Sequence, residues 1–165
     1  MWRNCLLLCL LFSSFPLWSQ NPIDSTLTPL FFLRTRPGLP PDSLVQPEYK
    51  GKRNTYFTLF ISKADEKGYA GYRYKEIRYL AYKNRIHSAD VRFEYTEDHK
   101  TFVDVLRYHY GEAEQPDPYR PYYYWYKPDV FISFEEDIIS GTIQVRVVSR
   151  SVQAQFEKDH PELME

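Results

Sequence analysis

The segment YRPYYYWY, Tyr119–Tyr126, has the residue types best suited to recognising a ligand. In an extended strand, one face would carry alternate tyrosines, namely Tyr122, Tyr124 and Tyr126. The other face would carry Tyr123 and Trp125. Aromatic rings bind a protein or a glycan over large areas with little loss of conformational entropy. We therefore expect a ligand on the Tyr122 face or, if that face is buried, on the Trp125 face. The alternative is aromatic pairing that stabilises the sheet.

Other reactive side chains do not form a pattern for catalysis or metal binding. The four histidines, His87, His99, His109 and His160, include no pair at ligand spacing with a third ligand nearby. His109 is interpreted as a half-buried packing residue. The acidic run Glu135–Asp137 lacks the alternating ligands and glycine of a calcium loop, and is interpreted as a solvated turn. No serine lies in a strand-turn-helix elbow flanked by glycines, and the glycines are scattered singly rather than grouped in a phosphate-binding loop. We expect no catalytic residue, metal or cofactor.

The N-terminus has the pattern of an export signal. Leu6–Phe12 is an apolar core that follows Arg3 and precedes the softer segment Ser13–Ser19. The alternative, a membrane anchor, needs about 20 mainly apolar residues, and this stretch is interrupted by serines and Pro16. We therefore expect cleavage after residues 1–19, a periplasmic or secreted protein, and no stable membrane span in the mature chain.

Cleavage would remove both cysteines, Cys5 and Cys9, so the mature chain would have neither a disulfide nor a thiol. Without Arg3, 20 basic residues face 22 acidic ones, a net charge of −2. This charge predicts no nucleic-acid partner. About 145 remaining residues are enough for one domain with its own core.

Residues 20–53 are rich in proline, which favours extended backbone and indicates a tether ahead of a domain over residues 54–160. One short stretch in this tether is apolar: Leu30, Phe31, Phe32 and Leu33. We expect it to dock on the domain as an edge strand or as a clip across the core. The alternative is that it binds a partner protein.

Strand patterns recur through the domain. They cover Thr55–Ser62, Tyr74–Tyr82, Arg85–Tyr95, Arg120–Tyr126, Val130–Glu135 and Thr142–Ser149. Two residues, Lys83 and Asn84, separate the second and third strands, which predicts a tight hairpin. In the last strand, Ile143, Val145 and Val147 are expected to point inward.

Between the third and fourth predicted strands lies a segment with the apolar period of an α-helix. Its apolar stripe consists of Phe102, Val105, Leu106, His109 and Tyr110. Thr96 is the expected N-cap and Gly111 the expected stop. A second, short helix is predicted over Ser151–Asp159, with Val152 and Phe156 on one face.

These elements predict a single two-layer α+β domain. An antiparallel sheet of about five to six strands would pack against one main helix, with a short helix at the C-terminus. The alternative is an all-β barrel, which would require that the helical stripe be misread.

The region Tyr74–Ser149 resembles small exported bacterial proteins that have no assigned activity. The shared layout is a strand hairpin, a helix ending in YHYG, a polar spacer containing proline, the strand YYYWY, and then VFISF and TIQVRVVS. The resemblance implies export and a mixed sheet and helix fold. It implies no functional residue.

The leading hypothesis is an exported, non-catalytic module that binds an envelope protein or glycan through Tyr122, Tyr124 and Tyr126. The alternative is a structural or assembly component of an envelope complex, with Leu30–Leu33 as its docking segment. A hydrolase acting on an envelope substrate is the third hypothesis, and it would require carboxylates or histidines that converge in a cleft.

Overall fold

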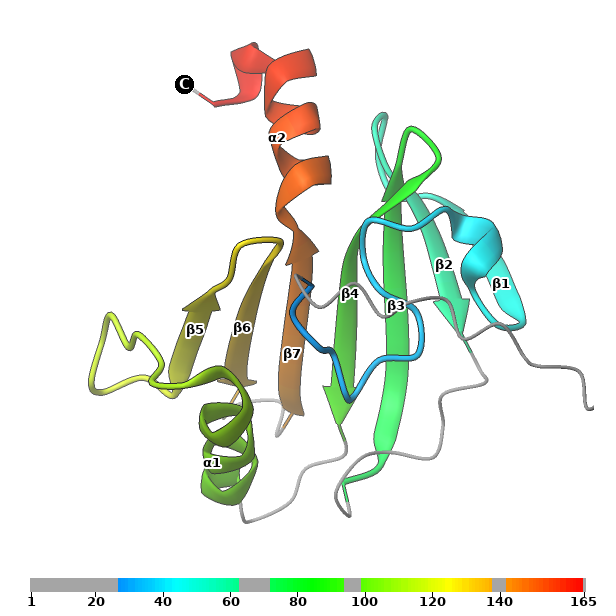
Figure 1. Cartoon of the computed structure of the whole chain (residues 1–165). Coiled ribbons are helices and arrows are strands. Elements are labelled where there is room, and N and C mark those ends of the chain that lie inside the picture. The colour runs from blue at the N-terminus through cyan, green and yellow to red at the C-terminus, as the bar shows by residue number, and fades with distance from the viewer. Residues whose placement is uncertain (1–26, 63–71, 94–98, 138–141, 165) are drawn as a thin grey trace, which may run out of the picture.

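The computed structural model describes residues 27–62, 72–93, 99–137 and 142–164. They form one seven-stranded antiparallel sheet, two α-helices and two short 3-10 helices (Figure 1). The strands are β1 (Pro47–Lys52), β2 (Thr58–Ser62), β3 (Tyr74–Tyr82), β4 (Arg85–Phe93), β5 (Tyr122–Tyr126), β6 (Val130–Asp137) and β7 (Thr142–Ser149). The helices are α1 (His99–Tyr110), α2 (Arg150–Asp159), η1 (Pro41–Ser43) and η2 (Pro161–Leu163). The predicted α+β class is confirmed, with seven strands in place of five to six.

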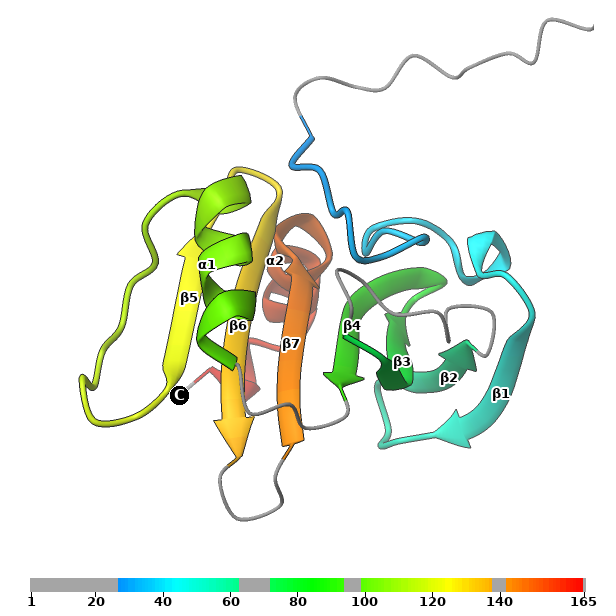
Figure 2. The same ribbon diagram turned by 90° about the horizontal axis from the view of Figure 1, so that it is seen from below.

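The sheet joins two antiparallel meanders in the order β1-β2-β3-β4-β7-β6-β5. The chain runs from β1 to β4, passes through α1 to the far edge of the sheet, and returns through β5 and β6. Strand β7 therefore lies in the middle and pairs with β4. Figure 2 shows α1 lying against the β5–β6 side of the sheet. The predicted signal peptide, residues 1–19, and the predicted N-cap Thr96 lie outside the described residues.

Two predicted turns are confirmed by the backbone. Lys83 and Asn84 have φ values of 44° and 60°, and positive φ at both positions is what a two-residue type I′ hairpin turn requires. Gly111 has a φ of 81°, and its N–H donates to the carbonyl of Arg107 at 2.7 Å. This left-handed residue ends α1.

One face of the sheet, which we call the core face, packs against α1. The ring of Phe102 lies 4.7 Å from that of Phe93 and 6.2 Å from that of Phe134. The predicted inward residues of β7 are all buried here: Ile143, Val145 and Val147. The predicted apolar stripe of α1 is correct only in part. Val103, which was not included in it, is buried, whereas His109, which was predicted to be half-buried, is exposed. The ring of His109 lies 3.9 Å from that of Phe31.

The predicted tether is wrong for the described residues 27–53, because they form part of the fold. Residues 47–52 are the edge strand β1, paired with β2. Upstream of β1, Leu30 and Phe32 are buried in the main core, and Tyr74 Oη donates to the carbonyl of Phe32 at 2.9 Å. The prolines are compatible with this packing since Pro41 starts η1 and Pro47 starts an edge strand, positions that need no N–H donor.

The stretch Leu30–Leu33 is therefore an internal clip. Phe31 and Leu33 also pack against the main core, and the Phe31 ring stacks on that of Tyr110 at 5.5 Å. Figures 1 and 2 show the N-terminal segment on the same side of the sheet as α1. In this arrangement Leu30 and Phe32 are not exposed for a partner protein.

The first predicted strand begins later than expected. Asn54 Oδ1 accepts hydrogen bonds from the backbone N–H groups of Tyr56 and Phe57, each at 2.9 Å. This side-chain turn keeps residues 54–57 out of the ladder, so that β2 starts at Thr58.

Helix α2 packs through a second, smaller apolar cluster. Val152 and Phe156, predicted to share one face, are buried with Tyr82, and Tyr56 and Phe57 pack against them. At the end of α2, Asp159 accepts hydrogen bonds from Tyr82 Oη and Lys83 Nζ, both at 2.8 Å. These bonds hold the pKa of Asp159 below its usual range, with the Lys83 bond as the largest cause.

Candidate functional site

The opposite side of the sheet, which we call the open face, is not covered by α1 or by the N-terminal segment (Figures 1 and 2). Two rows of cross-strand neighbours lie on it. The first row is Tyr126, Phe131, Val148, Ser88 and Leu80. The second row is Tyr124, Ser133, Arg146, Asp90 and Arg78. Helix α2 borders this face at one end.

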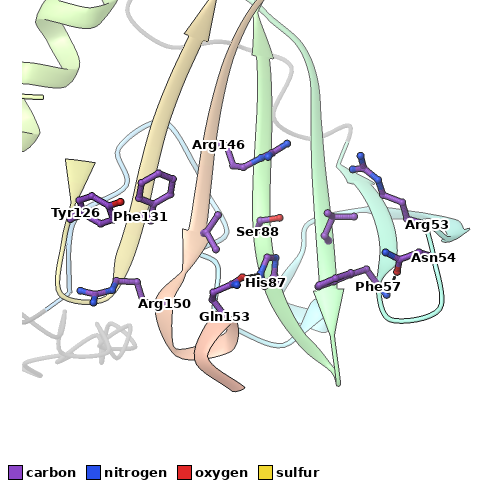
Figure 3. A pocket seen from close by; sticks show the side chains of 12 residues that line it. Arg53, Asn54, Phe57, His87, Ser88, Tyr126, Phe131, Arg146, Arg150 and Gln153 are labelled. Carbon is purple, nitrogen blue, oxygen red and sulfur yellow. Dashed lines mark hydrogen bonds between the residues drawn. The ribbon is translucent and has the colours of Figure 1, made fainter. Parts of the chain in front are cut away.

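A groove of about 670 Å³ is hollowed in the open face (Figure 3). Its floor contains Leu80, Val148 and Phe131. Tyr126 closes one end, and Phe57 lies at the other. This volume and the mixture of an apolar floor with polar groups are typical of a ligand-binding pocket.

Three arginines line the groove, and none of its lining residues is acidic. Arg146 Nε donates to Asp90 Oδ1 at 2.5 Å across the β4–β7 pair, and this bond raises the pKa of Arg146. Arg150 Nη1 donates to the backbone carbonyl of Lys127 at 2.9 Å. Within the described residues, the Arg53 guanidinium has neither a hydrogen bond nor an ion pair. Only one of the three cations is therefore balanced by a carboxylate.

His87 enters the groove because β4 bulges. The register passes from Leu80 opposite Ser88 to Ala81 opposite Ile86, which leaves His87 as the extra residue. Its Nε2 lies 2.6 Å from Oε1 of Gln153 on α2, and Figure 3 shows the two side chains next to each other. Burial lowers the pKa of His87, which favours the neutral ring. This contact joins α2 to the sheet.

The predicted tyrosines Tyr122, Tyr124 and Tyr126 do share the open face. Neighbouring ring centroids are 6.0 Å and 5.4 Å apart, and the Tyr126 ring lies 5.1 Å from that of Phe131. We call these three residues the tyrosine ladder. Burial, followed by a hydrogen bond to Glu114, raises the pKa of Tyr124. Tyr126, which is 62% exposed, also lines the groove, so the ladder and the groove are continuous.

Trp125 must be removed from the predicted binding residues. It lies on the core face with 2% of its surface exposed, and its Nε1 donates to the carbonyl of Gly111 at 2.8 Å. Its ring lies 6.2 Å from that of Tyr110 on α1. Since α1 covers this face, the alternative binding surface of Tyr123 and Trp125 is wrong.

The remaining candidates lie apart from the groove. His160 contacts Tyr82 at the end of α2, with 3.2 Å between Nε2 and Oη. Glu135 and Glu136 lie in β6 rather than in the predicted turn, because they pair with β7. In the part of the chain that the structure describes, no three His, Cys, Asp or Glu residues are grouped as a metal site.

The sequence did not reveal the polar residues of the groove. Arg53, His87, Arg146, Arg150 and Gln153 are far apart along the chain. They meet because β7 inserts beside β4 and because α2 follows β7 directly. The only local signal was the place of Arg146 between two inward valines.

Comparison with protein-family models, curated proteins and solved structures finds no match to this chain. None of the described helices has the length and apolar character needed to cross a bilayer. The function is therefore inferred from the geometry of the open face.

Proposed function

We propose that this chain is an exported, non-catalytic binding module that recognises an envelope component, a protein or a glycan, through its open face. The observation that carries the proposal is the continuity of the tyrosine ladder with the groove at Tyr126. Together they form one surface with an apolar floor, aromatic rings and hydrogen-bond donors. Such surfaces bind a ligand by contact area and fix its orientation by a few polar groups.

The chemistry of the groove favours binding over catalysis. Its charged groups are arginines, whose guanidinium groups donate hydrogen bonds but have no acceptor atom that could take a proton from a substrate. His87 is bonded to Gln153 through Nε2. Ser88 lines the groove on the same strand, but no hydrogen bond joins its hydroxyl to His87 among the described residues. The groove therefore supplies donors, rings and positive charge rather than a nucleophile with its base.

Export enters the proposal through the pattern of residues 1–19. We expect N-terminal sequencing of the protein from its native host to start near Gln20. A chain that starts at Met1 in the soluble internal fraction would contradict export. It would not bear on binding by the open face, which the tyrosine variants test.

The binding site is tested by two matched triple variants. In the first, Tyr122, Tyr124 and Tyr126 are changed to serine. In the second, the tyrosines changed to serine are exposed ones that do not belong to the ladder: Tyr49, Tyr108 and Tyr119. Binding to cell-wall glycans and to envelope extracts is measured after circular dichroism has confirmed folding. We expect binding to fall at least about tenfold in the first variant only, a loss of about 1.4 kcal/mol. Equal binding by both folded variants would refute the site.

A further inference from the structure

We propose that the ligand of the open face is an acidic glycan, with a carboxylate-bearing sugar in the groove and neutral sugars along the tyrosine ladder. This inference rests on the proposed function and names the class of ligand. It follows from four features: the charge of the groove, the polar groups at its rim, the carboxylates beside the tyrosine ladder, and the structure of the two sheet edges.

The groove is positive in a chain whose formal net charge is −1. Arg53 and Arg150 have no carboxylate partner among the described residues, and Arg146 is balanced by the buried Asp90. Arginine binds carboxylates through paired, charge-assisted hydrogen bonds. The uncompensated guanidinium groups therefore favour an anionic group in the groove.

The polar rim suits a hydroxylated ligand. The side-chain oxygen of Asn54 is occupied by two backbone N–H groups, whereas within the described residues its amide nitrogen has no partner. Asn54 lies at the groove between Arg53 and Phe57, as Figure 3 shows. An amide donor beside an aromatic ring is a combination that can bind sugar hydroxyls and the apolar face of the same ring.

The charge changes along the open face. Away from the groove, the ladder meets two carboxylates, since Tyr124 bonds to Glu114 and Tyr122 pairs with Glu135. These acidic groups disfavour further anions there. From Tyr122 to Tyr126 the strand spans about 13 Å, which leaves room for more than one sugar ring. The surface thus favours a chain that is charged at one end and neutral beyond it.

Both sheet edges are poorly suited to a peptide bound as an added strand. At the β5 edge, the backbone of Glu114 pairs with that of Tyr124 through bonds of 2.9 Å and 3.0 Å. At the β1 edge, the register shifts between Tyr49 and Gly51, so that Lys50 is the extra residue, and Lys52 follows the shift. Bulges, charges and covered backbone are features that prevent strand addition. A glycan on the face needs no free edge.

The experiment uses the full-length chain on an array of carboxylate-bearing oligosaccharides, their carboxyl-reduced neutral counterparts, and acidic peptides of equal charge. We expect the bound members to be acidic oligosaccharides, with at least about tenfold weaker binding after carboxyl reduction. Binding to the acidic members should weaken as salt is raised, because the contact is between charges. Stronger binding to the acidic peptides, to the neutral glycans, or to no member of the array would overturn the proposal.

The best acidic oligosaccharide is then titrated against R53Q, R150Q and the control R120Q. Arg120 is exposed and lies outside the groove. We expect the dissociation constant to rise about tenfold for each groove variant and less than twofold for R120Q. Equal constants for all three variants would overturn the groove as the carboxylate site. If the array fails while the tyrosine variants still lose binding to envelope extracts, the proposed function stands and only the acidic glycan is refuted.

Discussion

The two faces of the sheet are formed by the same strands but differ in burial, because one packs against α1 and the other is open. On β7, Val145 and Val147 are buried on the core face, whereas Arg146 between them lies on the open face. On β5, Trp125 is covered by α1, whereas its neighbour Tyr126 is exposed. The strand period of two assigns each residue to one face. The comparison shows that the residues on the core face form the hydrophobic core, whereas the alternate residues on the open face are available to bind a ligand.

The largest expected effect comes from removing a large ring from the core face. F102A should destabilise the protein by about 3–5 kcal/mol, because it deletes a buried ring that contacts Phe93 and Phe134. The matched open-face variant Y124A should cost only about 1 kcal/mol or less. Urea denaturation of both variants measures the contrast. Similar losses in the two would contradict the division between the faces.

The clip gives the next effect in size. F32A should cost about 3 kcal/mol, because Phe32 is buried in the main core rather than lying in a solvated tether. L39A, an exposed residue of the same segment, should stay within about 0.5 kcal/mol of the wild type. Thermal and urea unfolding measure both. A wild-type stability for F32A would restore the tether interpretation.

The free energy of unfolding should fall by different amounts when either partner of the Arg146–Asp90 ion pair is replaced by an uncharged residue. Asp90 is buried while Arg146 reaches solvent. R146M leaves a buried carboxylate without its partner and should cost about 3 kcal/mol. D90N leaves a cation that water can solvate and should cost about 1 kcal/mol. The reverse order in urea denaturation would mean that the buried partner has been misassigned.

The smallest expected effect is a pH dependence from His87. Its pKa in the folded protein is lowered by burial, so the unfolded chain binds a proton more readily. Stability should therefore fall as the pH drops below about 6.5 and level off below the pKa of the folded state. Proton NMR titration gives the pKa directly, and H87F should flatten this part of the stability profile. A His87 pKa at or above 6.5 would contradict a ring whose charged form is disfavoured by burial.

Local sequence patterns predicted most of the strands and helices, because these elements are determined by residues that are close together in the sequence. The limits of β3 and β7 were predicted from alternation, and the turn at Lys83 and Asn84 from its length. The docking of Leu30–Leu33 was predicted from its apolar residues and is confirmed. Strand β1 was missed because the prolines suggested extended, unpacked chain, whereas Pro41 and Pro47 occupy starts of elements that tolerate them.

The site was predicted only where one strand could define it. Tyr122, Tyr124 and Tyr126 share a face by period alone. The arginines of the groove come from residues 53, 146 and 150, and only the strand order β4-β7-β6 brings them together. A single sequence does not encode that order locally, because α1 can carry the chain to either edge of a sheet.

Hydroxyl-radical footprinting of the full-length chain, read residue by residue by mass spectrometry, compares Trp125 and Tyr126 on adjacent positions of β5. We predict rapid oxidation of Tyr126 and slow oxidation of Trp125, since they are 62% and 2% exposed. Addition of envelope extract should protect Tyr126 and leave Trp125 unchanged. Faster oxidation of Trp125, or protection of Trp125 in place of Tyr126, would contradict an open face that binds and a core face that folds.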